Sequence, residues 1–208
     1  EKYRHFFIDE FQDTSEMQWL NLIPLIDNAT SSEDLDGQKG SLLIVGDPKQ
    51  SIYRWRGGKA EQFIALSKDK NPFNNPDKKA ITLDTNYRSF SEVIDFNNNF
   101  FQMLSDEFTN EDYKDLYKNH SFQKSNSKQG GHVSISFISE DEELPTEDLF
   151  LLATYQKIEA LKAEKFKNND IVILTRKTAQ GSLIANYLNE KEIPVLSSES
   201  LLLASSSE

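Results

Sequence analysis

The sequence predicts an α/β protein in which parallel sheets are flanked by helices. Two short apolar runs end in carboxylates: HFFIDEFQDT at residues 5–14 and LLIVGD at residues 42–47. A stretch of helical periodicity lies between them, and the same alternation of strand-like and helix-like segments returns after residue 80. Strands that alternate with helices are typical of parallel sheets, because each helix carries the chain back to the start of the next strand.

The first part of the chain predicts strand, helix, strand and helix in that order. Residues 4–8 favour a short buried strand, and residues 42–47 a second one. A helix is expected from Thr14 or Ser15, either of which can cap it, to about Asn28. Its apolar residues recur at helical spacing and are Trp19, Leu20, Ile23 and Ile26. A further helix is expected from Ala60 to Ser67.

The composition of residues 68–79, rich in Pro, Asn, Asp and Lys, indicates a linker. We therefore expect one lobe at residues 1–67 and a second lobe at residues 80–208. In the second lobe the expected strands are 80–84, 132–138, 170–176 and 193–197. One helix is expected after Ser89, with Phe90 in its first turn, and it ends at about Leu104. Two more helices are expected at residues 147–165 and 178–192.

Composition narrows the function classes. The net charge of −11 argues against a surface coated with basic residues for nucleic acid, so any such binding must be local. The chain has no Cys, its three His (His5, His120 and His132) are scattered, and no apolar run approaches the roughly 18 residues of a membrane span. We expect a cytoplasmic protein with no membrane partner. The first residues resemble neither a translation start nor a signal peptide, so an internal piece of a longer protein is expected.

The carboxylates at the strand ends are candidates for chemistry. In open α/β sheets ligands bind beyond the carboxyl ends of the strands, so Asp9, Glu10 and Asp47 are expected on one rim. Adjacent residues that leave a strand point in opposite directions, so one acid can bind Mg²⁺ while its neighbour faces a water molecule. Two alternatives stay open: a surface turn without chemistry, and a two-metal nuclease site formed by the three acids.

One basic window stands out from the acidic background. Residues 49–59, KQSIYRWRGGK, contain no acid and place Tyr53 and Trp55 among four cations. Aromatic side chains between Lys and Arg offer stacking faces for bases and countercharge for phosphates, which is the usual arrangement for single-stranded nucleic acid. The alternative is that both aromatics belong to the core.

Three segments together resemble a known family. FFIDEFQDT is similar to motif II, the Walker B box, of UvrD-like superfamily 1 helicases; LLIVGDPKQSIYRWRGG resembles their motif III, and LDTNYRS resembles motif IV. They occur in the family's order and at compatible spacing. A weaker likeness continues through DIVILTRKTAQ, so the resemblance covers nearly the whole chain. It implies P-loop NTPase (RecA-like) motor lobes in incomplete form, with ATP and Mg²⁺ as cofactors.

The resemblance assigns roles residue by residue. It implies that Asp9 binds the Mg²⁺ of MgATP, that Glu10 is the general base for the attacking water, and that Gln12 helps to organise the same site. Gln50 matches the motif III glutamine that senses the terminal phosphate. Arg88 matches the motif IV arginine, and its forked guanidinium suits a phosphate reached from across a cleft.

The same resemblance extends to DNA. It implies that Trp55 stacks on single-stranded DNA with Tyr53 beside it, and that Arg56 lies where the DNA and ATP sites meet. Arg54 and Lys59 are expected to be merely solvated. Two residues of the second lobe, Arg176 and Gln180, match family positions but are as consistent with an ordinary surface.

One family feature is absent from the sequence. No G-x-x-x-x-G-K-[ST] phosphate loop occurs, so this chain alone is expected to bind ATP weakly and not to hydrolyse it. The motif III sequence GDPKQ resembles that of the RecB and AddA branch of the family, the helicase–exonuclease subunits of double-strand-break repair. The resemblance therefore implies part of an ATP-dependent 3′–5′ DNA helicase, with a possible partner subunit. The alternative is a non-catalytic DNA-binding or adaptor module.

Overall fold

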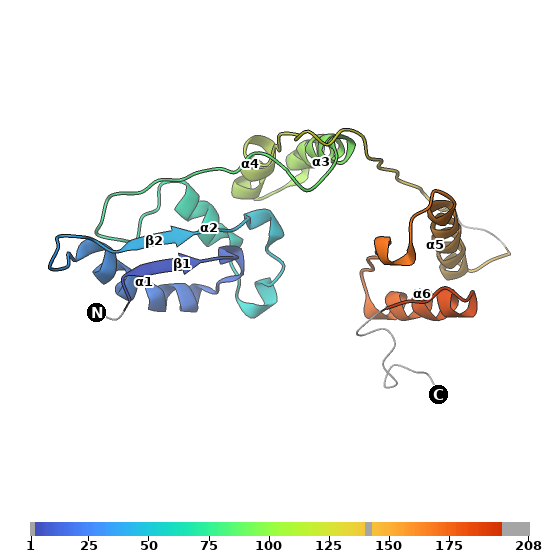
Figure 1. Cartoon of the computed structure of the whole chain (residues 1–208), viewed down its shortest axis with the longest axis horizontal. Coiled ribbons are helices and arrows are strands. Elements are labelled where there is room, and N and C mark those ends of the chain that lie inside the picture. The colour runs from blue at the N-terminus through green and yellow to red at the C-terminus, as the bar shows by residue number, and fades with distance from the viewer. Residues whose placement is uncertain (1–2, 140–142, 197–208) are drawn as a thin grey trace, which may run out of the picture. The chain divides into compact units, whose positions relative to one another are not determined.

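The computed structural model describes residues 3–139 and 143–196 of the chain. It divides into two compact units, Glu1–Val133 and Ser134–Glu208, and each is described by itself (Figure 1). In the described part of the chain, none of the helices combines the length and the hydropathy that crossing a bilayer requires.

The first unit is built on two parallel strands, β1 (His5–Ile8) and β2 (Ser41–Ile44). Their register pairs His5 with Ser41 and Ile8 with Ile44. Side chains alternate between the faces of a strand, and here only one face is covered. Phe6, Ile8, Leu42 and Ile44 pack against the core, whereas Phe7 and Leu43 are 75% and 50% exposed. The two predicted strands are thus present, although residues 4–8 are covered on one face only.

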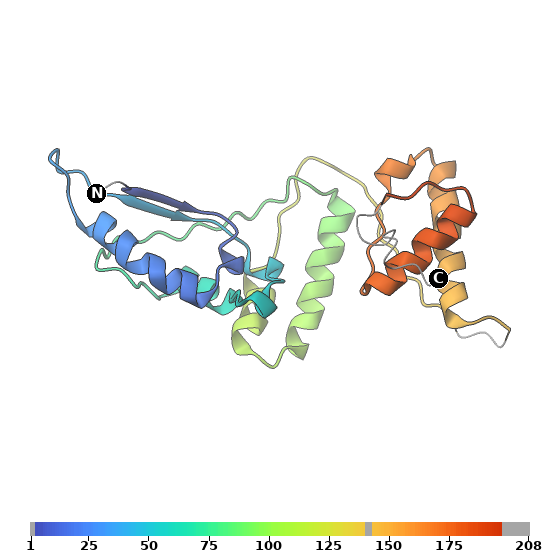
Figure 2. The ribbon, with the colours of Figure 1, turned by 90° about the horizontal axis from the view of Figure 1, so that it is seen from below.

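Helix α1 (Glu16–Ser31) connects the two strands and lies along the sheet (Figure 2). Ser15 caps it: the Ser15 hydroxyl accepts from the Gln18 amide and the Gln18 side chain accepts from the Ser15 amide. This reciprocal capping box satisfies two amides that have no partner inside the helix. The predicted start at Ser15 is confirmed, while the helix continues three residues beyond Asn28.

The core of the first unit joins the strands to α1 and α2 (Ala60–Ser67). Its centre is Phe11, whose ring lies 4.9 Å from that of Trp19 in an edge-to-face arrangement and 5.5 Å from that of Phe63. Such aromatic pairs add to the free energy gained by burial alone. The core therefore begins directly after Asp9 and Glu10 and holds the end of β1 in place.

Residues 68–79 contain no helix or strand, but they pack closely on α1. The Phe73 ring meets Trp19 at 5.9 Å, the Asn74 amide donates to Asp27 at 2.7 Å, and the Asn75 side chain donates to the Thr30 carbonyl at 2.9 Å. The segment thus continues the first unit, and the division by contacts falls at residue 133 rather than here.

Helices α3 (Ser91–Leu104) and α4 (Glu111–Asn119) form a pair that completes the first unit (Figure 2). Their contact is a ladder of rings, with Tyr117 stacked 5.5 Å from Phe101 and 5.0 Å from Phe108. Helix α3 was predicted from its periodicity. Helix α4 was not predicted, although Asn110 caps it by accepting from the amides of Asp112 and Tyr113.

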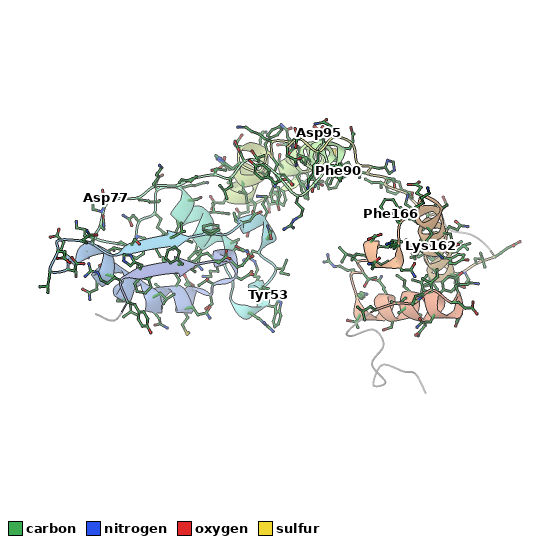
Figure 3. The ribbon with its side chains drawn as sticks, viewed as in Figure 1. Tyr53, Asp77, Phe90, Asp95, Lys162 and Phe166 are labelled. Atoms are coloured by element: carbon green, nitrogen blue, oxygen red, sulfur yellow. The ribbon has the colours of Figure 1, made fainter. Side chains whose placement is uncertain are left out.

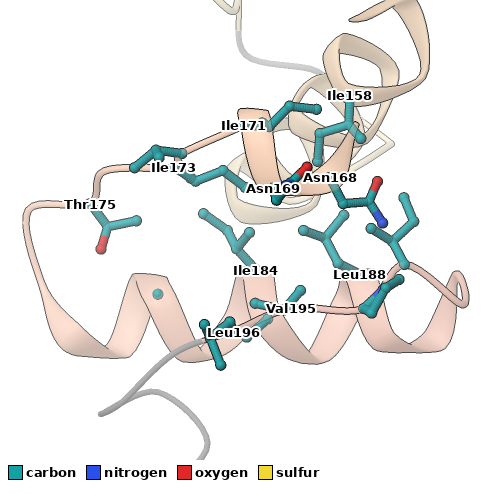
Figure 4. Close-up of a pocket in the computed structure, with 15 residues that line it drawn as sticks. Ile158, Asn168, Asn169, Ile171, Ile173, Thr175, Ile184, Leu188, Val195 and Leu196 are labelled. Carbon is teal, nitrogen blue, oxygen red and sulfur yellow. The ribbon is translucent and has the colours of Figure 1, made fainter. Parts of the chain in front are cut away.

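The second unit contains helices α5 (Thr146–Ala163) and α6 (Thr178–Glu190). They agree with the predicted helices at 147–165 and 178–192 to within two residues. Ile158, Leu188 and Ile193 form its core. A cavity of about 740 Å³ lies beside α6, and Ile171, Ile184 and Val195 are among the residues that line it (Figure 4).

The strands predicted for the second lobe are not formed in the described residues. Residues 80–84, 132–138, 170–176 and 193–196 contain no strand, and Ser197 lies outside the described residues. Their apolar side chains remain largely exposed, for example Leu83 at 87%, Phe137 at 94% and Leu174 at 91%. A strand needs backbone partners, and within the described residues these four segments form no ladder. An isolated parallel bridge between Thr85 and Lys124 lies beside the first of them. The predicted second parallel sheet is therefore not confirmed.

Candidate functional site at the ends of the two strands

The carboxyl ends of β1 and β2 lie side by side and continue their ladder into the loops. The Val45 amide donates to the Ile8 carbonyl at 2.8 Å, and the Phe11 amide donates to the Val45 carbonyl at 3.1 Å. Asp9 and Glu10 leave β1 between these two bonds. The loop that carries Asp47 leaves β2 directly after them, so the two predicted acidic strand ends share one edge of the sheet.

Asp9 and Glu10 are both exposed, and their backbone has an unusual conformation. Glu10 has φ 50° and ψ 42°, the left-handed region that side chains other than glycine rarely adopt. The Glu10 amide donates to Oδ1 of Asp9 at 2.9 Å, which holds the turn. Backbone strain of this kind is commonly retained at functional sites. It is consistent with two neighbouring carboxylates that serve different purposes.

Gln12 is the link between the two strand ends. Its side chain is 1% exposed. The Gln12 Nε2 atom donates to Glu10 Oε2 at 2.5 Å, while its Oε1 accepts from the Asp47 amide at 3.0 Å. The Gln12 carbonyl also accepts from the Ser51 hydroxyl at 3.3 Å. One buried amide therefore fixes the Glu10 carboxylate relative to the loop that follows β2.

Gly46 makes room for this link. A Cβ at position 46 would lie 2.5 Å from Gln12 Oε1, 3.0 Å from the Phe63 ring and 3.1 Å from the Phe11 amide nitrogen. Only glycine permits this close approach. The glycine of the GD pair in motif III is thus required by the packing of Gln12 beneath it.

We expect Gln12→Ala to destabilise the protein by about 1–3 kcal/mol, because the Asp47 amide loses its partner in a half-buried setting. The free energy of unfolding from urea titration measures this. Gln50→Ala is the matched control: Gln50 is an exposed amide that also bonds Asp47, and its loss should cost no more than about 0.5 kcal/mol. Equal effects in the two variants would contradict a central role for Gln12.

Asp47 is engaged within its own loop. Its Oδ1 accepts from the Lys49 amide at 3.0 Å and from Lys49 Nζ at 2.7 Å, and its Oδ2 accepts from Gln50 Nε2 at 3.1 Å. Burial raises the pKa of Asp47, but the hydrogen bonds and charge of Lys49 outweigh it and hold the pKa below its ordinary value. Among residues 3–139 and 143–196, no group of three or more His, Asp or Glu is arranged to hold a metal ion. The two-metal nuclease alternative gains no support.

The basic aromatic loop, residues 49–59, begins at this edge. Trp55 is 73% exposed and Tyr53 37%, so neither ring belongs to the core. Figure 3 labels Tyr53 on this loop. The Arg56 guanidinium lies 4.5 Å from the centre of the Trp55 ring and 5.5 Å from that of Tyr53. Such cation–π contacts hold a positive charge against the aromatic faces. The core alternative for these two aromatics is wrong.

Arg54 and Lys59 do more than the predicted solvation. Arg54 pairs with Glu61 and also donates to the Tyr113 hydroxyl at 2.9 Å, while Lys59 pairs with Glu16. Both cations are exposed, as predicted for solvated side chains. Their partners were not predicted because they come from α1, α2 and α4, and only the fold brings them to the loop.

Arg88 lies in a turn whose backbone is stabilised by hydrogen bonds with neighbouring side chains. The Asn86 side chain accepts from the amides of Arg88 and Ser89, both at 2.9 Å. Asn126 Nδ2 donates to the Ser89 carbonyl at 2.9 Å, and Lys128 Nζ donates to the Arg88 carbonyl at 3.2 Å. The guanidinium is exposed and has no hydrogen-bond or ion-pair partner among the described residues. Sequence reasoning missed the supporting role of Asn126 and Lys128, which nothing in their spacing indicates.

Arg176 and Gln180 belong to the second unit. Arg176 is exposed, and Gln180 Oε1 accepts from the Lys177 amide at 3.1 Å at the start of α6. A local capping role accounts for Gln180.

The residues at the strand ends include ligands suited to a hard cation such as Mg²⁺ and donors suited to a phosphate, but they do not form a complete ATP site. Asp9 and Glu10 present exposed carboxylate oxygens, the ligand type that Mg²⁺ prefers. Gln50 and the unpaired Arg88 guanidinium are donors of the kind that phosphate oxygens accept from. The phosphate loop that would complete an ATP site is not in this sequence.

The first unit thus combines a parallel strand pair, acids at the carboxyl edge of that pair and a basic aromatic loop that follows them. The family comparison identifies the family to which this chain belongs. Residues 1–71 match the model of the UvrD/REP helicase N-terminal domain, and residues 81–204 match that of the UvrD-like helicase C-terminal domain. The chain therefore belongs to the UvrD-like helicase family.

Three relatives illustrate the breadth of this family. The RecBCD enzyme subunit RecB of Chlamydia muridarum is 36% identical over 104 residues, which cover 50% of this chain and 9% of the relative. The Gabija protein GajB of Bacillus cereus is 32% identical over 190 residues, or 91% of this chain and 31% of GajB. The exonuclease/helicase subunit RexA of Lactococcus lactis subsp. cremoris is 30% identical over 219 aligned positions, covering 96% of this chain and 17% of RexA. The chain thus spans less than a third of each relative's length.

Proposed function

We propose that this chain is part of an ATP-dependent DNA helicase or translocase that moves 3′ to 5′ on single-stranded DNA. The observation that carries the proposal is the bridge made by Gln12. It joins Glu10, at the end of the first strand, to the loop that also presents the basic aromatic residues. A nucleotide site and a DNA site that share one short loop can influence each other directly.

On the nucleotide side, Asp9 would hold Mg²⁺ and Glu10 would accept the proton of the attacking water. Bound ATP would supply the phosphate whose hydrolysis drives movement. Gln12 Nε2 keeps the Glu10 carboxylate oriented, and Gln50 is placed by its bond to Asp47 at the same edge. Arg88 would bring positive charge to the terminal phosphate. Its lack of any partner in the described part of the chain leaves it available for that role.

On the DNA side, Trp55 and Tyr53 would stack on bases. The exposed indole offers a face to a base, and Arg56 supplies charge next to it for the phosphate backbone. The formal charge of −11 confines this binding to the basic aromatic loop.

We further propose that the parent protein is a helicase–exonuclease subunit that acts in double-strand-break repair together with a partner subunit, in the cytoplasm. Two observations support a helicase–exonuclease parent: the sequence GDPKQ in motif III, and the similarity of the chain to RecB and to RexA.

A second candidate is a DNA-binding or adaptor module without ATPase activity. The observation that favours it is the absence of a phosphate loop from the 208 residues. This chain by itself is expected not to hydrolyse ATP on either proposal. A phosphate loop encoded directly upstream of Glu1 would support the ATP-dependent helicase. A start codon immediately before Glu1 would support the DNA-binding or adaptor module.

The experiment that tests the motor is Glu10→Gln in the protein that also carries the phosphate loop. We expect ATP binding to persist and DNA-stimulated turnover to fall by about 100-fold or more, because the amide cannot accept the proton of water. ATP hydrolysis and binding of labelled ATP are measured side by side.

Glu33→Gln is the control for loss of a negative charge. Glu33 is exposed and precedes β2, at the opposite end of the strand from Asp47. Its turnover should equal that of the unmodified protein. Normal turnover in Glu10→Gln would overturn the assignment of Glu10 as the base.

A further inference from the structure

The contacts of Arg54 define a cluster that the proposed function does not use. Arg54 Nη2 pairs with Glu61 Oε1 and donates to the Tyr113 hydroxyl at 2.9 Å. The Tyr113 hydroxyl in turn donates to the same Glu61 oxygen at 3.2 Å. The three side chains form a closed triangle, which we call the loop clamp. They come from the basic aromatic loop, from α2 and from α4.

The loop clamp holds the Arg54 side chain against Glu61 and Tyr113, at one side of the loop. Arg54, Trp55 and Arg56 form one turn of 3₁₀ helix, in which successive side chains point in different directions. With Arg54 turned toward α4, the neighbouring Trp55 is left 73% exposed. Arg56 then covers part of the indole from the loop side.

The opposite side of the loop is anchored separately. Gly58 forms an antiparallel bridge with Ser15, and Lys59 pairs with Glu16 at the start of α1. Gly57, at φ 87°, ends the 3₁₀ turn in a conformation suited to glycine. The loop is therefore fixed to α1 on one side, and the loop clamp attaches its aromatic turn to α4 on the other.

The electrostatics support an ionised clamp. Burial raises the pKa of Glu61, but the hydrogen bonds that its carboxylate accepts, first of all from Arg54, and the Arg54 charge together outweigh burial and lower the pKa overall. Burial, together with the Glu61 charge, raises the pKa of Tyr113, so its hydroxyl keeps its proton and can donate. Lys68 adds a second tie between the end of α2 and α4, with Nζ 3.2 Å from Asp112 and 3.0 Å from Asp115.

The loop clamp crosses the boundary between the two family domains. Arg54 and Glu61 lie in the part matched by the N-terminal domain, and Tyr113 lies in the part matched by the C-terminal domain. We propose that Tyr113 is a positioning residue for single-stranded DNA: through Arg54 and Glu61 it holds the basic aromatic loop in the conformation that presents Trp55 to a base. This inference rests on the proposed DNA binding.

The test uses Tyr113→Phe in the full chain, with Tyr117→Phe as the matched control. Both tyrosines lie on α4 and have their rings beside that of Phe108, stacked for Tyr117 and tilted for Tyr113. Of the two hydroxyls, that of Tyr113 is the one that bonds to Glu61 and Arg54. The chain has two Trp, and Trp19 is 3% exposed, so acrylamide quenching reports mainly on Trp55. Because the loop clamp leaves Trp55 exposed, we expect weaker quenching in Tyr113→Phe than in Tyr117→Phe, in the absence of DNA.

The second measurement is the affinity for an oligothymidylate. Tyr113→Phe should weaken binding by about three- to ten-fold, the range for one lost hydrogen bond, while the slope of affinity against salt stays unchanged because no cation is removed. Thermal unfolding of both variants checks that they are folded.

Each outcome decides the question. Quenching that is equal in the two variants overturns the loop clamp, and weaker quenching with unchanged affinity overturns the positioning role. If the unmodified chain does not bind the oligonucleotide, the proposed DNA binding fails, while the quenching comparison still decides whether Tyr113 restrains the loop.

Discussion

Replacing Trp55 with Ala is expected to weaken the binding of single-stranded DNA by roughly 5- to 150-fold, the effect of losing one base-stacking face. Trp55 is the most exposed ring of the basic aromatic loop, at 73%, and Arg56 lies against it. Removing the indole therefore removes the stacking surface and the platform that places the Arg56 charge. Fluorescence anisotropy of a labelled oligothymidylate, at one fixed salt concentration, measures the loss.

Ile52→Ala provides a matched control for this result. Ile52 lies on the same loop and is 71% exposed, so its truncation removes a similar amount of exposed apolar surface without a stacking ring. Its affinity should match that of the unmodified chain. In addition, DNA should quench the tryptophan fluorescence of the unmodified chain, and Trp55→Ala should lose most of that quenching. Quenching that survives in the variant would refute stacking on Trp55.

The elements that the sequence predicts well are those determined by local chemistry. The strand at residues 5–8 follows from its apolar run, and α1 begins at Ser15 because a serine three residues before Gln18 can form a capping box. Helix α2 has the predicted bounds, Ala60–Ser67. In each case the residues that form the element also carry the signal for it.

The elements that were mispredicted depend on partners that are distant in the sequence. Residues 80–84 and 170–176 have the apolar pattern of strands, but a strand forms only beside a neighbour. In the described residues the backbone hydrogen bonds of Asp84 and Asn86 with Lys124 do not extend into a ladder, and residues 170–176 are not paired in one. Helix α4 is short and mostly polar, and the side chains that hold it are Leu116, which is buried, and Tyr117, which stacks on Phe101 and Phe108. Its role as the partner of Arg54 therefore could not be predicted.

In the candidate site, too, some features follow from the local sequence and others depend on packing between distant residues. Motif chemistry singles out Asp9, Glu10 and Gln50, whereas the way they are connected depends on burial. Gln12 bridges the strands because Phe11 beside it is 0% exposed, which draws the amide into the core. Gly46 leaves the space for it. A motif identifies such residues, but only the packing explains why a glutamine and a glycine are required at these positions.

The largest effect on stability is expected for Gly40→Ala, which should lower the free energy of unfolding by about 3 kcal/mol or more. A Cβ at position 40 would collide with the carbonyl oxygen of Arg4 and would lie 2.6 Å from that of Ala29. Both are backbone atoms, one beside β1 and one in α1, so neither can rotate away. Urea unfolding followed by circular dichroism measures the loss.

Gly37→Ala separates this collision from the general cost of replacing a glycine. Gly37 lies in the same loop at φ +73°, and nothing lies within 4 Å of the point that a Cβ would occupy, so its replacement should cost only about 1 kcal/mol. The Arg4 carbonyl also accepts from the Ser41 amide at 3.0 Å, the bond that opens the ladder of β1 and β2. Displacing it should disturb the register that places Asp9 and Glu10 beside Asp47. Gly40→Ala should therefore weaken the strand-end site as well as the fold, and equal stabilities of the two variants would contradict this account.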